Sequence, residues 1–129
     1  DEATREINSL TLAALKAREV FDNRDIIILG DLNADCKRGD AYFDEDDLSS
    51  PLRSSEYIWL IPNDADTNIA ESDCAYDRII ITWNALEDYK GEWGVFLFDV
   101  LYNLNSEDAK RFSDHYPVWV EFYTDRDTD

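Results

Sequence analysis

Three short stretches combine an aspartate with another side chain that can bind a metal ion or transfer a proton. They are GDLN at 30–33, YDRI at 76–79 and SDH at 113–115. Each lies at an end of a predicted strand, which is where ligands collect in open α/β sheets. The histidine in the third stretch, His115, is the only one in the chain. These stretches therefore indicate one site assembled from distant parts of the sequence.

Each residue type in these stretches has a chemical use. Asp31 and Asn33 are two positions apart and would point the same way in extended backbone, offering a carboxylate and an amide to a cation and a phosphate. Asp114 and His115 are adjacent, so they diverge and serve different partners. Asp77 is the candidate that would hold the imidazole of His115, because a histidine base needs a carboxylate to fix its tautomer.

Each stretch taken alone also has an ordinary structural interpretation. Asp31 would be a turn residue after a strand, since aspartate and asparagine are common in turns. Asp77 would form a weak surface pair with Arg78. His115 would be a structural histidine. The functional hypothesis depends on the three stretches occurring together, in this order.

The apolar pattern predicts the elements that would position these residues. An amphipathic helix is expected from Thr4 to Phe21, with an apolar face comprising Ile7, Leu10, Ala14, Ala17 and Phe21. A strand buried on both faces is expected at 25–31. Further strands are expected at 57–62, 77–84, 93–100 and 117–123, and a short helix capped by Ser106 precedes the last of them. The order predicts one domain over residues 1–129 with an α/β (α+β) fold, mostly sheet.

Composition limits the functions that this domain could have. Thirty acidic residues against 12 basic ones give a formal net charge of −18, which argues against a broad electrostatic grip on nucleic acid. It does not exclude a nuclease in which carboxylates bind a metal and the metal meets the phosphate. High acidity is also a property of salt-tolerant proteins. No apolar run approaches the roughly 18 residues that a membrane span needs, so we expect no membrane partner.

Longer motifs give the chain a family resemblance. GDLNADC (30–36), WLIPNDADT (59–67), CAYDRIIIT (74–82) and SDHYPVWVEF (113–122) together resemble the deoxyribonuclease I family, part of the endonuclease/exonuclease/phosphatase superfamily. The stretches GDLN and SDHYP alone would indicate only the superfamily. NADC and CAYDR, each with a cysteine, narrow the resemblance to the deoxyribonuclease I branch.

The resemblance implies roles for individual residues. His115 matches a catalytic histidine, Asp77 the aspartate that orients it, and Asn33 an asparagine that contacts the scissile phosphate and the metal. Asp31 and Asp114 match carboxylates of the metal and phosphate site, and Tyr76 matches a residue that lines it. The implied reaction is hydrolysis of DNA phosphodiester bonds with Mg²⁺ or Mn²⁺.

The resemblance also implies features outside the catalytic site. Cys36 and Cys74 match a family disulfide, which would place the protein in a secreted, extracellular compartment. The loop at 64–73 lies where the family has a calcium site. Asp66, Asn68 and Ser72 keep oxygen ligands there, whereas Ala70 lacks one.

The chain resembles only the C-terminal half of the family's four-layer α/β sandwich. We therefore expect the isolated chain to be inactive or weakly active, and its inner sheet face, with side chains from 26–29, 79–81 and 118–122, to need a cover. The cover would be a complementary N-terminal half or a second copy. Nothing in the chain supports actin binding. The alternatives are another phosphodiesterase or phosphatase of the superfamily, and a non-catalytic acidic interaction domain.

Overall fold

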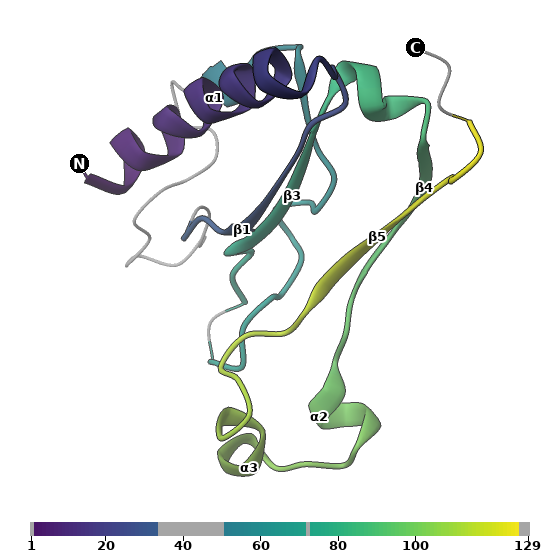
Figure 1. The fold of residues 1–129 in the computed structure, drawn as a ribbon. Helices are drawn as coiled ribbons and strands as arrows, with labels where there is room; N and C mark the ends of the chain where they lie inside the picture. The colour runs from purple at the N-terminus through teal and green to yellow at the C-terminus, as the bar shows by residue number, and fades with distance from the viewer. Residues whose placement is uncertain (1, 34–50, 72, 127–129) are drawn as a thin grey trace.

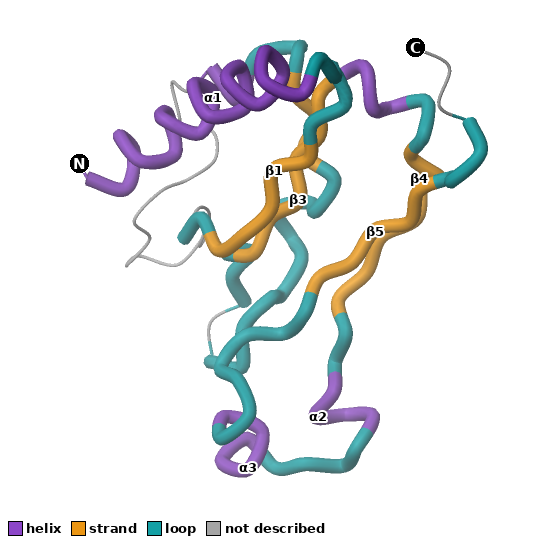
Figure 2. The backbone as a smooth tube through the Cα atoms, in the orientation of Figure 1, coloured by secondary structure: helices purple, strands orange, loops and turns teal. Residues whose placement is uncertain are grey.

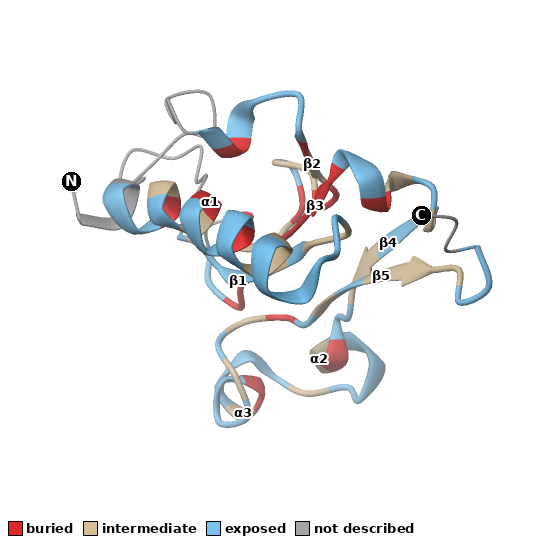
Figure 3. Ribbon diagram, turned by 45° about the horizontal axis from the view of Figure 1, so that its top comes forward, coloured by how far each residue is buried: buried red, intermediate tan, exposed pale blue. Residues whose placement is uncertain are grey.

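The computed structural model describes residues 2–33, 51–71 and 73–126 (Figure 1). Helix α1, Glu2–Phe21, is the longest element and confirms the predicted N-terminal helix. Ile7, Thr11 and Ala14 are buried along it at the i, i+4, i+7 spacing of one helix face, which Figure 3 shows turned toward the sheet. Phe21 is the exception to the predicted apolar face. It is 75% exposed and lies at the last position of the helix.

A three-stranded antiparallel sheet lies under this helix (Figure 2). Its strands are β1 (Ile27–Asp31), β2 (Tyr57–Trp59) and β3 (Asp77–Thr82), in the order β1-β3-β2. The ladder between β1 and β3 pairs Ile27 with Ile81 at one end and Asp31 with Asp77 at the other. Two of the candidate aspartates therefore lie opposite each other on neighbouring strands.

A separate two-stranded antiparallel sheet is formed by β4 (Tyr89–Val95) and β5 (Val118–Phe122). The short helices α2 (Phe98–Leu101) and α3 (Ser106–Lys110) connect these strands, at the end of the molecule away from α1 (Figure 1). Two 3-10 helices, η2 (Pro51–Arg53) and η3 (Trp83–Leu86), lie beside β2 and β3. With its helices and antiparallel sheets, the described part of the chain confirms the α+β class.

Two local predictions in this region were wrong. The strand expected at 93–100 ends at Val95, and its second half forms α2, where Phe98 is buried as one face of a helical turn. The residue that caps α3 is Asn105 rather than Ser106, because the side chain of Asn105 accepts a hydrogen bond from the backbone N–H of Asp108.

The three-stranded sheet contributes to an apolar core on each of its faces. Ile80 packs in a cluster with Ile7 and Ala14 of α1. Ile79 and Ile81 point the other way and belong to a second cluster, against which Val118, Val120 and Phe122 of β5 pack. Strand β3 is therefore the strand buried on both faces, with α1 on one side and the β4–β5 sheet on the other.

The prediction of burial on both faces was wrong for β1, which lies at an edge of its sheet. Ile27 is 44% exposed and Leu29 is 70% exposed, because the β4–β5 pair covers β3 without reaching across β1. For the same reason, the expectation that Ile79–Ile81 would form part of a bare inner face was wrong. All three are buried, and Val118, Val120 and Phe122 are partly buried.

Candidate functional site

The candidate site lies where strand β1 ends and strand β3 begins. Asp31 is the last residue of β1 and Asp77 is the first of β3, so the ladder register places them side by side. Asp31 is exposed, and Asp77 is partly buried. The antiparallel pairing, rather than any contact between the side chains, therefore brings these two carboxylates together.

His115 joins this pair from the other sheet. Its Nδ1 lies 2.7 Å from Oδ2 of Asp77. One ligand atom from each of Asp31, Asp77 and His115 lies within 4.8 Å of the other two. Since an ionised carboxylate only accepts hydrogen bonds, Nδ1 carries the proton in this contact, and Nε2 is left to exchange a proton with water or a substrate.

The local electrostatics favour the protonated imidazole. Burial acts to lower the pKa of His115, but the hydrogen bond to Asp77 and the negative charges of Asp77, Asp31 and Asp114 outweigh it. The net result is a pKa above the ordinary value of 6.5. The protonated imidazole can donate a proton, and the neutral form can accept one.

Tyr76 lies beside the imidazole, as the resemblance implied. Its ring centroid is 6.0 Å from that of His115, with an interplanar angle of 33°. The backbone of Tyr76 is held on two sides, because its carbonyl accepts from the N–H of Leu32 at 2.9 Å and its N–H donates to the hydroxyl of Thr67 at 3.0 Å. Tyr76 therefore has its ring next to His115, and its role as a residue that lines the site stays a prediction.

Asn33 is placed differently from the sequence argument. That argument assumed extended backbone from Asp31 to Asn33, whereas Asn33 has φ +48° in the left-handed region. Its N–H donates to Oδ1 of Asp31 at 2.8 Å. Asp31 therefore closes a turn, the ordinary role considered for it, while no described residue donates a hydrogen bond to its other oxygen.

Asp114 is exposed and is not one of the three clustered residues. Its backbone carbonyl accepts from Ile69 N–H at 2.8 Å. Its carboxylate contributes to the raised pKa of His115. Its part in metal binding stays a prediction.

The predicted calcium loop consists of successive turns that use its own oxygens. Oδ1 of Asp66 accepts from Asn68 N–H at 3.2 Å, and Oδ1 of Asn68 accepts from Ala70 N–H at 2.8 Å. Burial is the largest cause of a raised pKa at Asp66. Ser72 lies outside the described residues, so the calcium site stays a prediction.

The structure describes only one of the two cysteines of the predicted disulfide. Cys74 is fully buried, and its carbonyl accepts hydrogen bonds from the N–H and the hydroxyl of Thr67. Cys36 lies outside the described residues. The pairing of these two cysteines therefore stays a prediction.

Sequence reasoning missed a buried arginine next to the site. Arg78 was considered as a surface partner of Asp77, but it is 1% exposed. Its Nη1 donates to the carbonyl of Ile61 at 2.8 Å and to Oδ1 of Asn63 at 2.9 Å, and its guanidinium lies 5.3 Å from the ring centre of Trp59. Arg78 thus anchors β3 to the chain that follows β2, and the adjacent residue Asp77 remains directed at His115.

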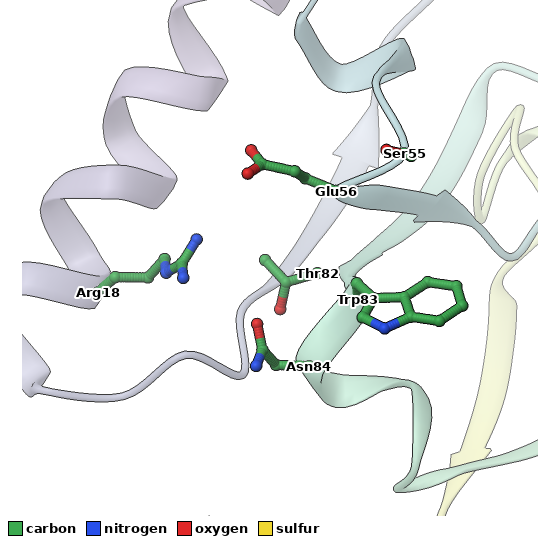
Figure 4. Close-up of a pocket in the computed structure, with 6 residues that line it drawn as sticks. All are labelled: Arg18, Ser55, Glu56, Thr82, Trp83 and Asn84. Carbon is green, nitrogen blue, oxygen red and sulfur yellow. The ribbon is translucent and has the colours of Figure 1, made fainter.

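A pocket at the other end of β3 does not coincide with the candidate site (Figure 4). Its lining residues are Arg18, Ser55, Glu56, Thr82, Trp83 and Asn84. Thr82 ends the strand that Asp77 begins, so the two regions are separated by the length of β3. None of the lining residues belongs to the group around His115.

Comparison with known proteins identifies relatives that share nearly the whole chain. It is 42% identical to deoxyribonuclease-1 from Ovis aries over 123 residues, which are 92% of this chain and 46% of that protein. It is 40% identical to deoxyribonuclease-1 from Bos taurus, covering 92% of this chain and 42% of that protein. The resemblance to the deoxyribonuclease I family is confirmed. A further member, deoxyribonuclease-1-like 2 from Mus musculus, is 39% identical over 95% of this chain and 44% of its own length.

No family model matches the chain. The chain spans less than half the length of the curated deoxyribonucleases that it resembles. Among its described residues, no helix is long and apolar enough to cross a membrane.

Proposed function

We propose that this chain supplies part of the active site of a metal-dependent endonuclease that hydrolyses DNA phosphodiester bonds. The observation that supports this most directly is the 2.7 Å contact between His115 and Asp77, with Asp31 in the same cluster. The curated relatives carry the name deoxyribonuclease. In such a hydrolysis, a paired imidazole and carboxylate can transfer the proton, and a second carboxylate can bind the metal ion.

In this proposal His115 moves the proton. Asp77 holds Nδ1–H, which fixes the tautomer and directs Nε2 toward the reacting phosphate. Nε2 would exchange a proton with the attacking water or the leaving oxygen, while Asp77 stabilises the imidazolium that forms. The raised pKa of His115 favours the protonated imidazole, which can donate a proton from Nε2.

The donor set fits a divalent cation. Asp31 is exposed, and its second oxygen accepts no hydrogen bond from the described residues. Carboxylate oxygens are preferred by Mg²⁺ and Mn²⁺. We propose Asp31 as the main ligand from this chain, with Asn33 and Asp114 near it. A bound cation would neutralise charge on the phosphate. We also propose a weaker Ca²⁺ site at Asp66, Asn68 and Ser72.

The site is incomplete in this chain alone. A complementary N-terminal half of the same fold would cover the exposed apolar side chains on β1, which are Ile27 at 44% and Leu29 at 70% exposure. It would also bring the further residues of the active site. A second copy of the chain is the alternative cover. The isolated chain is therefore proposed to be inactive or weakly active.

We further propose that the protein is secreted, with a disulfide between Cys36 and Cys74, and that its acidity suits it to high salt. The net charge of −18 and the complete burial of Cys74 support these proposals. Non-reducing and reducing mass spectrometry of the purified chain would detect or exclude the disulfide.

Plasmid nicking in Mg²⁺ and Ca²⁺ buffer tests the function. The chain would be assayed alone and mixed with a complementary N-terminal half, as wild type, His115→Ala and Asp77→Asn. Glu92→Gln, which removes an exposed carboxylate from β4, is the control for loss of one charge. We expect nicking by the mixture only, lost in both site variants and kept in the control.

Two results would contradict parts of this proposal. A folded mixture that leaves plasmid intact, with every metal tried, would overturn the nuclease assignment. Nicking by the chain alone that vanishes in His115→Ala would keep the assignment and show that no complementary half is needed.

A further inference from the structure

The contact between Asp77 and His115 joins two sheets that share no strand ladder. Asp77 begins β3 of the three-stranded sheet, whereas His115 precedes β5 of the two-stranded sheet. The β1–β3 ladder fixes Asp77 relative to Asp31, but it does not fix His115. Some other part of the chain must therefore hold the imidazole at hydrogen-bonding distance from Asp77.

The segment 67–69 binds directly to the backbone around His115. Ile69 N–H donates to the carbonyl of Asp114 at 2.8 Å, and Tyr116 N–H donates to the carbonyl of Thr67 at 2.9 Å. Asn68 forms an isolated antiparallel bridge with His115 itself. This segment therefore acts as a short strand partner for residues 114–116.

Thr67 connects the same segment to the start of β3. Its side chain is fully buried. The hydroxyl donates to the carbonyl of Cys74 at 3.2 Å and accepts from the N–H groups of Tyr76 at 3.0 Å and Asp77 at 3.1 Å. One donor and two lone pairs are all that a threonine hydroxyl has, so its hydrogen-bonding capacity is fully used.

We infer that Thr67 is the positioning residue for the Asp77–His115 pair. Its hydroxyl fixes the backbone that carries Asp77, while its carbonyl fixes the backbone next to His115. A side chain of the same shape without the hydroxyl would leave two N–H groups and a carbonyl without this partner. The chain would then relax at 74–77, and the distance between Asp77 and His115 would no longer be set. This inference deepens the proposed function, but it concerns the geometry of the pair and can fail independently.

Nuclear magnetic resonance on the 129-residue chain tests this without any DNA. With one histidine in the chain, the Nδ1–H proton of His115 gives a single downfield signal that reports its hydrogen bond to Asp77. We expect Thr67→Val, which keeps the shape, to lose or strongly shift this signal and to speed amide exchange at Tyr76 and Asp77 at least about tenfold. Thr67→Ser, which keeps the hydroxyl, is expected to retain the wild-type signal and exchange.

Ile7→Ala is the control for general destabilisation, because Ile7 is 3% exposed in the core under α1 and away from this segment. It should lower stability and leave the His115 signal unchanged. A folded Thr67→Val chain with the wild-type signal and exchange would overturn the inference. If Thr67→Val does not fold, the wild-type chain provides the test. Its Thr67 hydroxyl proton should exchange slowly and show cross-peaks to the amide protons of Tyr76 and Asp77. The absence of these cross-peaks would refute the positioning role of Thr67.

Discussion

Replacing Tyr116 with phenylalanine would remove one buried hydroxyl and leave the ring in place. The hydroxyl donates to Oδ2 of Asp99 at 2.8 Å, and Tyr116 is 8% exposed. The ring meets Phe98 edge-on, with centroids 5.7 Å apart. The contact therefore ties α2 to the segment between His115 and β5.

The expected loss of stability follows from the charge of Asp99, the hydrogen-bond partner of the Tyr116 hydroxyl. A hydrogen bond to a charged group contributes about 1.5 to 3 kcal/mol. Asp99 keeps a second bond, because its Oδ1 accepts from Val100 N–H at 2.7 Å, and it is only partly buried, so water can replace the lost donor. We therefore expect Tyr116→Phe to lower the free energy of unfolding by about 1.5 kcal/mol at neutral pH.

The same contact has a pH dependence of known sign. Burial, with the hydrogen bond and the charge of Asp99 adding to it, raises the pKa of Tyr116 from 10.0 to about 12. The neutral phenol is therefore favoured by folding, and its contribution is complete below pH 10 and lost as the pH rises through 12. Two pH units at 1.36 kcal/mol each set an upper bound of roughly 2.7 kcal/mol on this loss.

Urea unfolding followed by circular dichroism at pH 7 and at pH 10.5 would measure both effects. Tyr102→Phe is the matched control, because Tyr102 is 65% exposed. We expect the control to change stability by less than about 0.5 kcal/mol. A Tyr116→Phe chain with the wild-type urea midpoint at pH 7, or with the wild-type loss between the two pH values, would refute the reasoning.

Four further predictions concern other parts of the chain. Gly94→Ala should lower the free energy of unfolding, measured in urea, by about 1 to 3 kcal/mol, because the added Cβ would lie 2.6 Å from a ring carbon of Trp119. An unchanged free energy of unfolding would mean that the indole moves aside freely. The side chain of Ile80 is fully buried between the sheet and α1, so Ile80→Ala should lower the free energy of unfolding by about 2 to 5 kcal/mol and Ile80→Val by about 1 kcal/mol. Equal losses for the two variants would contradict tight packing at this position. Leu29→Lys should reduce self-association in sedimentation experiments without lowering stability, because Leu29 is an exposed apolar side chain on β1. An unchanged mass distribution would show that copies of the chain do not associate through β1. The imidazole of His115 should titrate above pH 6.5 in EDTA, so that its contribution to stability is complete below pH 6.5 and fades as the pH rises through its folded pKa; a value below 6.5 would mean that burial prevails over Asp77.

Much of the candidate site could be predicted because it depends on strand ends. The pattern of apolar runs located the ends of β1 and β3, whereas the register that pairs Asp31 with Asp77 is seen only in the structure. The need of a histidine for a carboxylate partner predicted the contact between His115 and Asp77, which the structure contains. The strand ends and the His115–Asp77 contact require only local periodicity and general chemistry.

The predictions that failed concern features set by neighbouring elements of the fold, which sequence periodicity does not describe. The apolar run 26–29 reads the same whether a strand is central or at an edge, so the exposure of Leu29 was not foreseen. Asn33 adopts a left-handed φ, so the extended backbone assumed from Asp31 to Asn33 is absent. Phe98 lies in an apolar run that fits a strand or a helix equally well, and burial against Tyr116 favours the helix.

The role of Thr67 was also invisible in the sequence. A threonine in a polar loop ordinarily indicates a turn, and only the folded chain shows three backbone groups meeting at its hydroxyl. The sequence shows only that Thr67 stands seven residues before Cys74, in a loop that must return to the start of β3. That spacing alone does not say which side chain closes the loop.

The register that pairs Asp31 with Asp77 places two like charges directly opposite each other, an arrangement that weakens a ladder. A cation bound at Asp31 would relieve that repulsion, so under the proposed function the ion is also a ligand of the folded state. At a hundredfold excess over its dissociation constant, such a ligand adds about 2.7 kcal/mol to stability. Chelating the metal in a cleavage assay would then alter how much of the protein is folded, as well as its chemistry. Thermal melts with and without Mg²⁺ are needed before any loss of activity in EDTA is assigned to catalysis alone.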